Sequence, residues 1–156
     1  MKNISRNDVI ELITKYRLAF IARDKLIDEL EGNFENIESG IFDMVYHELS
    51  GCSNGFLSDF YLTLTGDKVE VIGEIQQLLV CPCCGFRTLS EIYDACKGTG
   101  YDICKYCEWE DDGTVEASKS SSVNRGSISE YRNRILENKN FFYKNKWLKY
   151  SAKCLC

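Results

Sequence analysis

Two pairs of cysteines near the middle of the chain have the residue type and the spacing to do chemistry. Cys81 and Cys84 are two residues apart, as are Cys104 and Cys107, and residues 85–103, 19 in number, separate the pairs. Four thiolates at this spacing can surround one ion as a tetrahedron, with metal–sulfur distances of about 2.3 Å. The pattern predicts one structural zinc ion held by these four cysteines, with no ligand position left open.

The residues inside and after the first pair fit a tight turn. Two intervening residues allow both sulfurs to point at one position, and the turn amides can offset their charge. Pro82 fixes φ within the turn, and Gly85 can adopt a positive φ or allow a close backbone approach. Each cysteine pair is therefore expected to lie at the end of a hairpin, and the two together to form a zinc ribbon.

Other interpretations of the cysteines stay open at this point. Cys83 could replace Cys81 or Cys84 as a ligand, and iron can occupy a four-cysteine site. A thioredoxin-like redox pair would need one exposed thiol of low pKa between a strand and a helix, which fits two equal pairs less well. The remaining cysteines are interpreted as bystanders: Cys52, Cys96, Cys154 and Cys156.

The first 76 residues are expected to form four helices followed by one strand. Ser5 and Asp8 mark a helix start, and a second helix is expected from about Asp24 to Leu30, ended near Gly32. A third helix should stop at Gly51, and a fourth should begin at a capping Asn54 and close at Gly66. The expected buried positions are Val9, Leu12, Ile13, Tyr16, Ile41, Phe42, Val45, Leu49, Phe56, Phe60 and Leu64. Val69 and Val71 alternate as in a strand.

The remainder divides into a ribbon module at 77–112 and a segment at 113–156. Residues 112–127 are rich in Ser and Gly and predict a surface loop. Ser127 and Glu130 form a capping-box pattern before a helix that carries Ile128, Tyr131, Ile135 and Leu136. The predicted fold is α+β, one compact unit in which a helical N-terminal part (1–76) packs against a four-cysteine zinc ribbon, with a C-terminal helix and a basic aromatic tail.

The composition restricts the compartment and the class of protein. The chain has 156 residues, 44% of them hydrophobic, which is enough apolar material for a core without disulfides. The first ten residues lack the apolar run of a signal peptide, and no stretch approaches the roughly 18 apolar residues of a membrane span. With an odd count of nine cysteines, the expected compartment is the reducing cytoplasm.

Charge is distributed unevenly. The net charge of −5 argues against general nucleic-acid binding. No Lys or Arg occurs between Leu26 and Asp67, and this stretch can present an acidic face to a basic partner or act only as a solvated surface. The candidate partner-binding residues are Asp28, Glu29, Glu31, Glu35, Glu38, Asp43 and Glu48.

The residues around both cysteine pairs resemble the bacterial CPCC family of cysteine-rich proteins. The resemblance lies in Cys81-Pro-Cys-Cys-Gly-Phe-Arg-Thr-Leu89, Gly100-Tyr-Asp-Ile-Cys104 and Cys107-Glu-Trp-Glu-Asp-Asp112. It implies a small cytoplasmic metal-binding domain without an assigned reaction, and some members lie beside polymorphic toxins as presumed immunity proteins. This chain departs from the pattern in an insert at 91–99, which contains Cys96, and in the polar region after Asp112. Trp109 is expected to pack on the ribbon, and the acids that follow it can bind a basic partner or hold turn amides.

Three functions are compared. The favoured one is a zinc-binding immunity protein that neutralises a cognate toxin, such as a nuclease, through its acidic face. The alternative is a nucleic-acid-binding zinc ribbon that uses the lysines and aromatic residues of 139–153, although these aromatics can equally pack on the core. An enzyme is the least favoured, because the only histidine, His47, has no evident catalytic set around it. Oligomeric state and partner identity are left open.

Overall fold

The computed structural model describes residues 1–32, 35–94, 96–138 and 145–149, with the side chains of 135–138 excluded. Two compact units divide the chain, residues 1–76 and 77–156, and each is described by itself. The expected packing of one part against the other stays a prediction. Helices and small strands both occur, so the fold is α+β as the sequence predicts.

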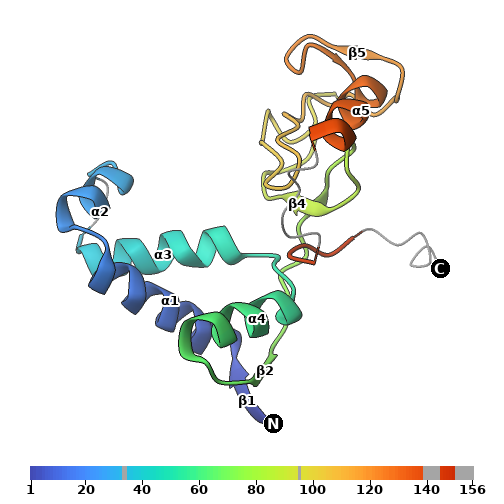
Figure 1. The fold of residues 1–156 in the computed structure, drawn as a ribbon. Helices are drawn as coiled ribbons and strands as arrows, with labels where there is room; N and C mark the ends of the chain where they lie inside the picture. The colour runs from blue at the N-terminus through green and yellow to red at the C-terminus, as the bar shows by residue number, and fades with distance from the viewer. Residues whose placement is uncertain (33–34, 95, 139–144, 150–156) are drawn as a thin grey trace. The chain divides into compact units, whose positions relative to one another are not determined.

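The first unit is a short parallel sheet with four helices (Figure 1). Strand β1 pairs with β2 in parallel; α1 contacts α3, α4 and both strands, α4 contacts β2, and α2 contacts α3. The elements are β1 (Lys2–Ser5), α1 (Arg6–Phe20), α2 (Arg23–Glu29), α3 (Ile37–Leu49), α4 (Asn54–Thr65) and β2 (Val69–Ile72).

Local capping explains where the helices begin and end. Ser5 caps α1 by accepting from the Asp8 amide at 3.1 Å, and the Asp8 carboxylate accepts from the Ser5 amide at 3.2 Å. Gly66 ends α4 in a left-handed conformation with φ of 79°. Both features confirm the sequence expectation. The capping residue of α4, however, is Ser53 rather than Asn54, because the Ser53 hydroxyl accepts from the Phe56 amide at 3.0 Å.

The apolar core of this unit follows the predicted periodicity in part on α1 and α3 and not on α4. The expected positions that are buried on α1 and α3 are Val9, Ile13, Ile41, Val45 and Leu49, whereas Leu12, Tyr16 and Phe42 are half-buried. On α4 the fully buried residue is Leu57, and the expected stripe of Phe56, Phe60 and Leu64 is only half-buried. Strand β1 was not expected, because its four residues contain a single apolar side chain and its partner lies more than 60 residues away.

The described residues of the second unit form small hairpins and one helix. Strands β3 (Leu79–Val80) and β4 (Arg87–Leu89) form an antiparallel pair, and β5 (Ser120–Ser121) pairs with β6 (Gly126–Ser127). Helix α5 (Ile128–Asn138) begins at the expected capping box, in which the Ser127 amide donates to Glu130 Oε2 at 2.7 Å. The expected surface loop at 112–127 is wrong in part, because this segment contains the second hairpin and buries Thr114, Ser121 and Asn124.

Candidate metal centre

The first cysteine pair lies in the turn that joins β3 to β4. The Cys81 amide donates to the Phe86 carbonyl at 2.8 Å, and the Gly85 amide donates to the Cys81 carbonyl at 2.9 Å. Gly85 has φ of 76°, as predicted, and a Cβ there would meet no atom within 4 Å. The glycine is therefore required for its backbone conformation and not for a close approach.

The second pair lies in a turn with the same hydrogen-bond pattern. The Cys104 amide donates to the Trp109 carbonyl, and the Glu108 amide donates to the Cys104 carbonyl, both at 2.9 Å. Glu108 occupies the position that Gly85 holds in the first turn, and it has φ of 62°. A residue with a side chain is thus held in the left-handed region, which costs about 1 kcal/mol.

These two turns bring four sulfurs together. The Sγ atoms of Cys81, Cys84, Cys104 and Cys107 all lie within 4.8 Å of one another. The Cys81–Cys107 and Cys84–Cys104 sulfur pairs are each 3.7 Å apart. A tetrahedron with metal–sulfur bonds of about 2.3 Å requires sulfurs about 3.8 Å apart. The four cysteines are therefore positioned to bind one metal ion.

Hydrogen bonds converge on one of the four sulfurs. Cys104 Sγ lies 2.9 Å from the Thr88 hydroxyl and accepts from the amides of Tyr106 and Cys107, each at 3.4 Å. Thr88, whose hydroxyl makes the shortest of these contacts, is fully buried. Sequence reasoning did not select Thr88, and its position in β4, four residues after Cys84, is the only signal that could have indicated it.

The protonation of the cluster favours a cation at its centre. Hydrogen bonds from Cys107, Cys81 and Cys84 hold the pKa of Cys104 far below the usual range of a thiol. Because those three thiols interact with the ionised Cys104, their own pKa values lie far above that range. Four thiolates in this volume would repel one another strongly, and a bound metal ion would supply the compensating positive charge.

Helix α5 supports the first turn. Arg132 donates through Nε to the Cys83 carbonyl at 2.5 Å and through Nη2 to the Pro82 carbonyl at 3.0 Å. Tyr131 meets Trp109 edge to face, with ring centroids 5.2 Å apart, and burial raises the pKa of Tyr131 to about 12. Trp109 is fully buried, which confirms that it packs on the ribbon. Sequence reasoning missed Arg132, which lies about 50 residues from the turn that it contacts.

Asp111, the second acid after Trp109, has a structural role. Asp111 is 2% exposed, and its carboxylate accepts from the amides of Thr99 at 2.9 Å and Gly113 at 3.3 Å. The Glu110 amide donates to Asn124 Oδ1 at 2.9 Å, and Asn124 Nδ2 donates to the Glu110 carbonyl at 2.8 Å. The Asn124 side chain thus makes the pair of hydrogen bonds that a neighbouring strand would make. This arrangement bears out the structural interpretation of Asp111, and the insert at 91–99 is tied to the ribbon through it.

The other cysteines lie outside the four-sulfur cluster. Cys83 is buried beside it, at 1% exposure, but does not belong to the set of four converging sulfurs. Cys52 is buried in the first unit, and Cys96 is exposed in the insert. Cys154 and Cys156 lie outside the described residues. None of the seven described cysteines forms a disulfide.

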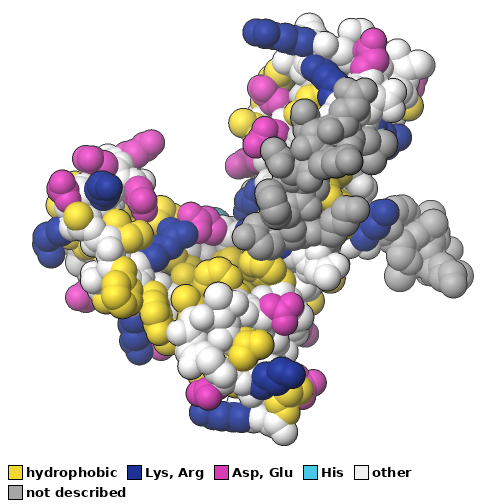
Figure 2. Space-filling model, in the orientation of Figure 1, with side chains coloured by type: hydrophobic (Ala, Val, Ile, Leu, Met, Phe, Trp, Pro, Cys, Tyr) yellow, Lys and Arg dark blue, Asp and Glu magenta, His cyan; other side chains and the backbone are white. Residues whose placement is uncertain are grey.

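The predicted acidic residues lie on α2, on α3 and between these helices, and all seven are exposed. Glu48 forms an ion pair with Arg17, at 2.6 Å between Oε2 and Nη2. No ion pair of the other six occurs within the described part of the chain, and acidic side chains are visible over α2 in Figure 2, with Lys and Arg among them. The seven are Asp28, Glu29, Glu31, Glu35, Glu38, Asp43 and Glu48.

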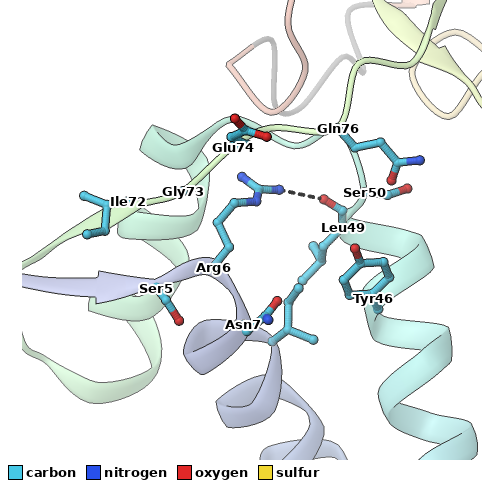
Figure 3. Close-up of a pocket in the computed structure, with 11 residues that line it drawn as sticks. Ser5, Arg6, Asn7, Tyr46, Leu49, Ser50, Ile72, Gly73, Glu74 and Gln76 are labelled. Atoms are coloured by element: carbon cyan, nitrogen blue, oxygen red, sulfur yellow. Dashed lines mark hydrogen bonds between the residues drawn. The ribbon is translucent and has the colours of Figure 1, made fainter.

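A cavity of about 260 Å³ in the first unit lies among the start of α1, the end of α3 and the residues after β2 (Figure 3). Arg6 crosses it and donates to the carbonyls of Cys52 at 2.8 Å and Leu49 at 3.3 Å, and to Asn54 Oδ1 at 2.7 Å. Burial lowers the pKa of Arg6. These acceptors belong to the end of α3 and the start of α4, so Arg6 joins the helices. The cavity lining contains no Cys or His.

In the part of the chain that the structure describes, each helix is too short or too polar to cross a bilayer.

Comparisons with known proteins give a match to one protein family. No curated protein and no solved structure gives a significant match. Residues 79–137, which are 59 of the 156, match the family described as Cysteine-rich CPCC. This segment begins with β3, includes both cysteine turns and ends within α5. Residues 79–137, a little over a third of the chain, are therefore similar to the cysteine-rich CPCC family.

Proposed function

We propose that this chain is a zinc-binding immunity protein, which neutralises a cognate bacterial toxin by binding it directly. The metal has a structural role, because four cysteine ligands close a tetrahedral shell and leave no position for a substrate. Zinc fits this ligand set better than harder cations, because thiolates are soft ligands and the sulfur spacing is tetrahedral.

The observation that supports a protein partner is the uncompensated acidity of the first unit. Residues 1–76 contain 14 Asp and Glu against seven Lys and Arg, a formal charge of −7, whereas residues 77–156 contain ten against 12, a formal charge of +2. Seven exposed acids on and around α2 and α3 are suited to attract a basic surface and to speed association with it. A nuclease toxin, whose active site must attract phosphates, is a partner of that kind.

The experiment begins with identification of the partner and ends with a quantitative test. A tagged chain is used to capture proteins from the native host after nuclease treatment at low salt, and the captured protein is then purified. Calorimetry with the purified pair should show one-to-one binding that weakens at high salt. Replacing Glu31, Glu35 and Glu38 together with Gln should weaken binding at least tenfold and reduce protection when the toxin is co-expressed.

The matched control replaces Glu70 and Glu116, which are exposed and lie outside the acidic stretch, with Gln. These changes should leave binding within about twofold, because exposed charges far from an interface are screened by salt. Equal loss in both variants would show that net charge and not the α2–α3 surface controls the interaction. A purified partner that binds without loss of toxicity would overturn the immunity role.

A further inference from the structure

The two cysteine turns and the described end of the chain place three lysines on one surface of the second unit. Lys105 lies in the second turn, and Lys146 and Lys149 lie in the segment 145–149. That segment runs beside β4, because the Arg87 amide donates to the Leu148 carbonyl at 2.8 Å and Phe86 forms an antiparallel bridge with Lys149. Lys105 and the segment 145–149, which are about 40 positions apart in sequence, therefore lie close together beside the two cysteine turns.

Aromatic rings hold the three ammonium groups in place. The Nζ atoms of Lys105 and Lys146 lie over the ring of Trp147, at 5.7 and 5.2 Å from its centroid. Lys149 Nζ lies 5.8 Å from the centroid of the Phe86 ring. Trp147 is 5% exposed and so forms a fixed support. Lysines held by cation–π contacts lose less side-chain entropy when they bind an anion than free lysines do.

A pair of rings adjoins these lysines. Phe86 and Tyr106 lie with centroids 4.4 Å apart, and both are half-buried. Tyr106 follows Lys105 in the second turn, and Phe86 carries Lys149. The surface therefore offers cations for phosphates and partly exposed ring faces for bases, the two features that single-stranded nucleic acids require. Trp147 is too buried to stack on a base, so its role is to hold lysines.

The three lysines are a local group of positive charge although the whole chain is acidic. Residues 81–87, 104–110 and 145–149 contain four Lys and Arg and two acids, Glu108 and Glu110. Four thiolates with one divalent metal ion contribute a charge of −2, so these segments are formally neutral, and neither acid belongs to the group of lysines and rings. Most of the acids that give the chain its net charge of −5 lie in other segments, mainly in residues 1–76.

We propose that this surface, formed by Lys105, Lys146, Lys149, Phe86 and Tyr106, binds single-stranded nucleic acid. The lysines contact successive phosphates, and the Tyr106–Phe86 pair receives a base. An acidic protein would use the lysines and leave the rings without a role, so nucleic acid accounts for more of the surface. The activity goes beyond the proposed immunity function and does not depend on the acidic residues of α2 and α3.

The test uses the full metal-loaded chain and a fluorescent, mixed-sequence single-stranded RNA of about 12 nucleotides, with binding followed by anisotropy. Affinity should fall with salt with a logarithmic slope of about −2, since three phosphate contacts each contribute about −0.7. Lys105→Glu and Lys149→Glu should each reduce affinity about tenfold or more. Tyr106→Leu should also reduce it about tenfold, with the salt slope unchanged.

The matched controls are Lys97→Glu and Lys119→Glu, which reverse exposed lysines elsewhere in the same unit and should change affinity less than threefold. Metal content verifies that each variant is folded, and Lys105→Gln and Lys149→Gln replace any reversal that fails to load metal. Absence of binding at low salt, or equal loss in variants and controls, would overturn the proposal. Displacement of the RNA by polyglutamate at equal charge concentration would also overturn it and assign the surface to acidic proteins.

Discussion

Cys104 differs from the other three candidate ligands in the hydrogen bonds that its sulfur receives. One hydroxyl and two amides approach it, whereas Cys84 is the one ligand that is partly exposed. Hydrogen bonds to a ligating sulfur stabilise its negative charge and orient it toward the metal. Cys104 is therefore the ligand that the surrounding residues hold most firmly, and Thr88 is the residue outside the cluster that contributes most directly.

Replacing Thr88 with Val should weaken metal binding, because the hydroxyl that reaches Cys104 Sγ at 2.9 Å is lost while the shape is kept. Supporting contacts of this kind change metal affinity by about 10- to 100-fold. Competition with a chromophoric chelator measures the effect. Thr99→Val is the control, because Thr99 is equally buried but its hydroxyl has no hydrogen-bond partner among the described residues. Equal affinities of the two variants would show that the Thr88 contact does not act on the metal.

Glu108 and Gly85 follow the two cysteine pairs and both have a left-handed backbone, so exchanging their residue types should change the free energy of unfolding in opposite directions. Glu108→Gly should raise the free energy of unfolding by about 0.5–1 kcal/mol, because glycine adopts φ of 62° without steric cost. Gly85→Ala should lower it by about 1 kcal/mol, although space for the methyl group exists. Denaturant unfolding at saturating metal measures both, and a stabilising Gly85→Ala would contradict this account.

At the scale of elements, Arg132 is the residue of α5 that donates hydrogen bonds to the first cysteine turn. Arg132→Gln should remove the hydrogen bonds to the carbonyls of Pro82 and Cys83, at a cost of about 1–3 kcal/mol because charged donors are lost. The first turn should then open more often, and metal should leave faster. Transfer of metal to a strong chelator after mixing measures the rate. Lys119→Gln, in an exposed position of the same unit, should leave it unchanged.

Elements that depend on local interactions could be predicted from the sequence, and those that depend on distant pairing could not. The Ser5–Asp8 and Ser127–Glu130 caps lie within three residues, so their side chains indicate the helix starts directly. Strand β1 and the hairpin at 120–127 contain few apolar residues, and their positions depend on partners elsewhere in the chain. The buried Leu57 was missed because the aromatic residues beside it gave a stronger helical pattern.

The candidate site shows the same division. Cysteine spacing alone identified the four sulfurs, because two turns of fixed geometry bring each pair together. Thr88 and Arg132 could not be found in that way, since a threonine in a strand and an arginine on a helix have no distinctive spacing from the cysteines. Of the predicted basic aromatic tail, residues 139–144 and 150–156 lie outside the described residues, and Trp147 is buried as the packing interpretation expected.

At the scale of the whole molecule, the two units should respond differently to loss of metal. The described residues of 77–156 have short strands and a core built around the four cysteines, Leu89, Trp109 and Ile128, so their stability should depend on a bound ion. Residues 1–76 have their own apolar core. Chelation should increase hydrogen exchange throughout 77–138 and leave α1 and α3 protected. Uniform loss of protection across both units would show that they unfold together.

The four-sulfur cluster should make the lifetime of the chain depend on metal supply. If folding of the second unit and metal binding are one equilibrium, each tenfold fall in free metal removes about 1.4 kcal/mol of its stability. A cell short of the metal would hold molecules with an intact helical half and an unfolded half that proteases can degrade. Protein abundance would then follow the supply of the metal without any change in transcription.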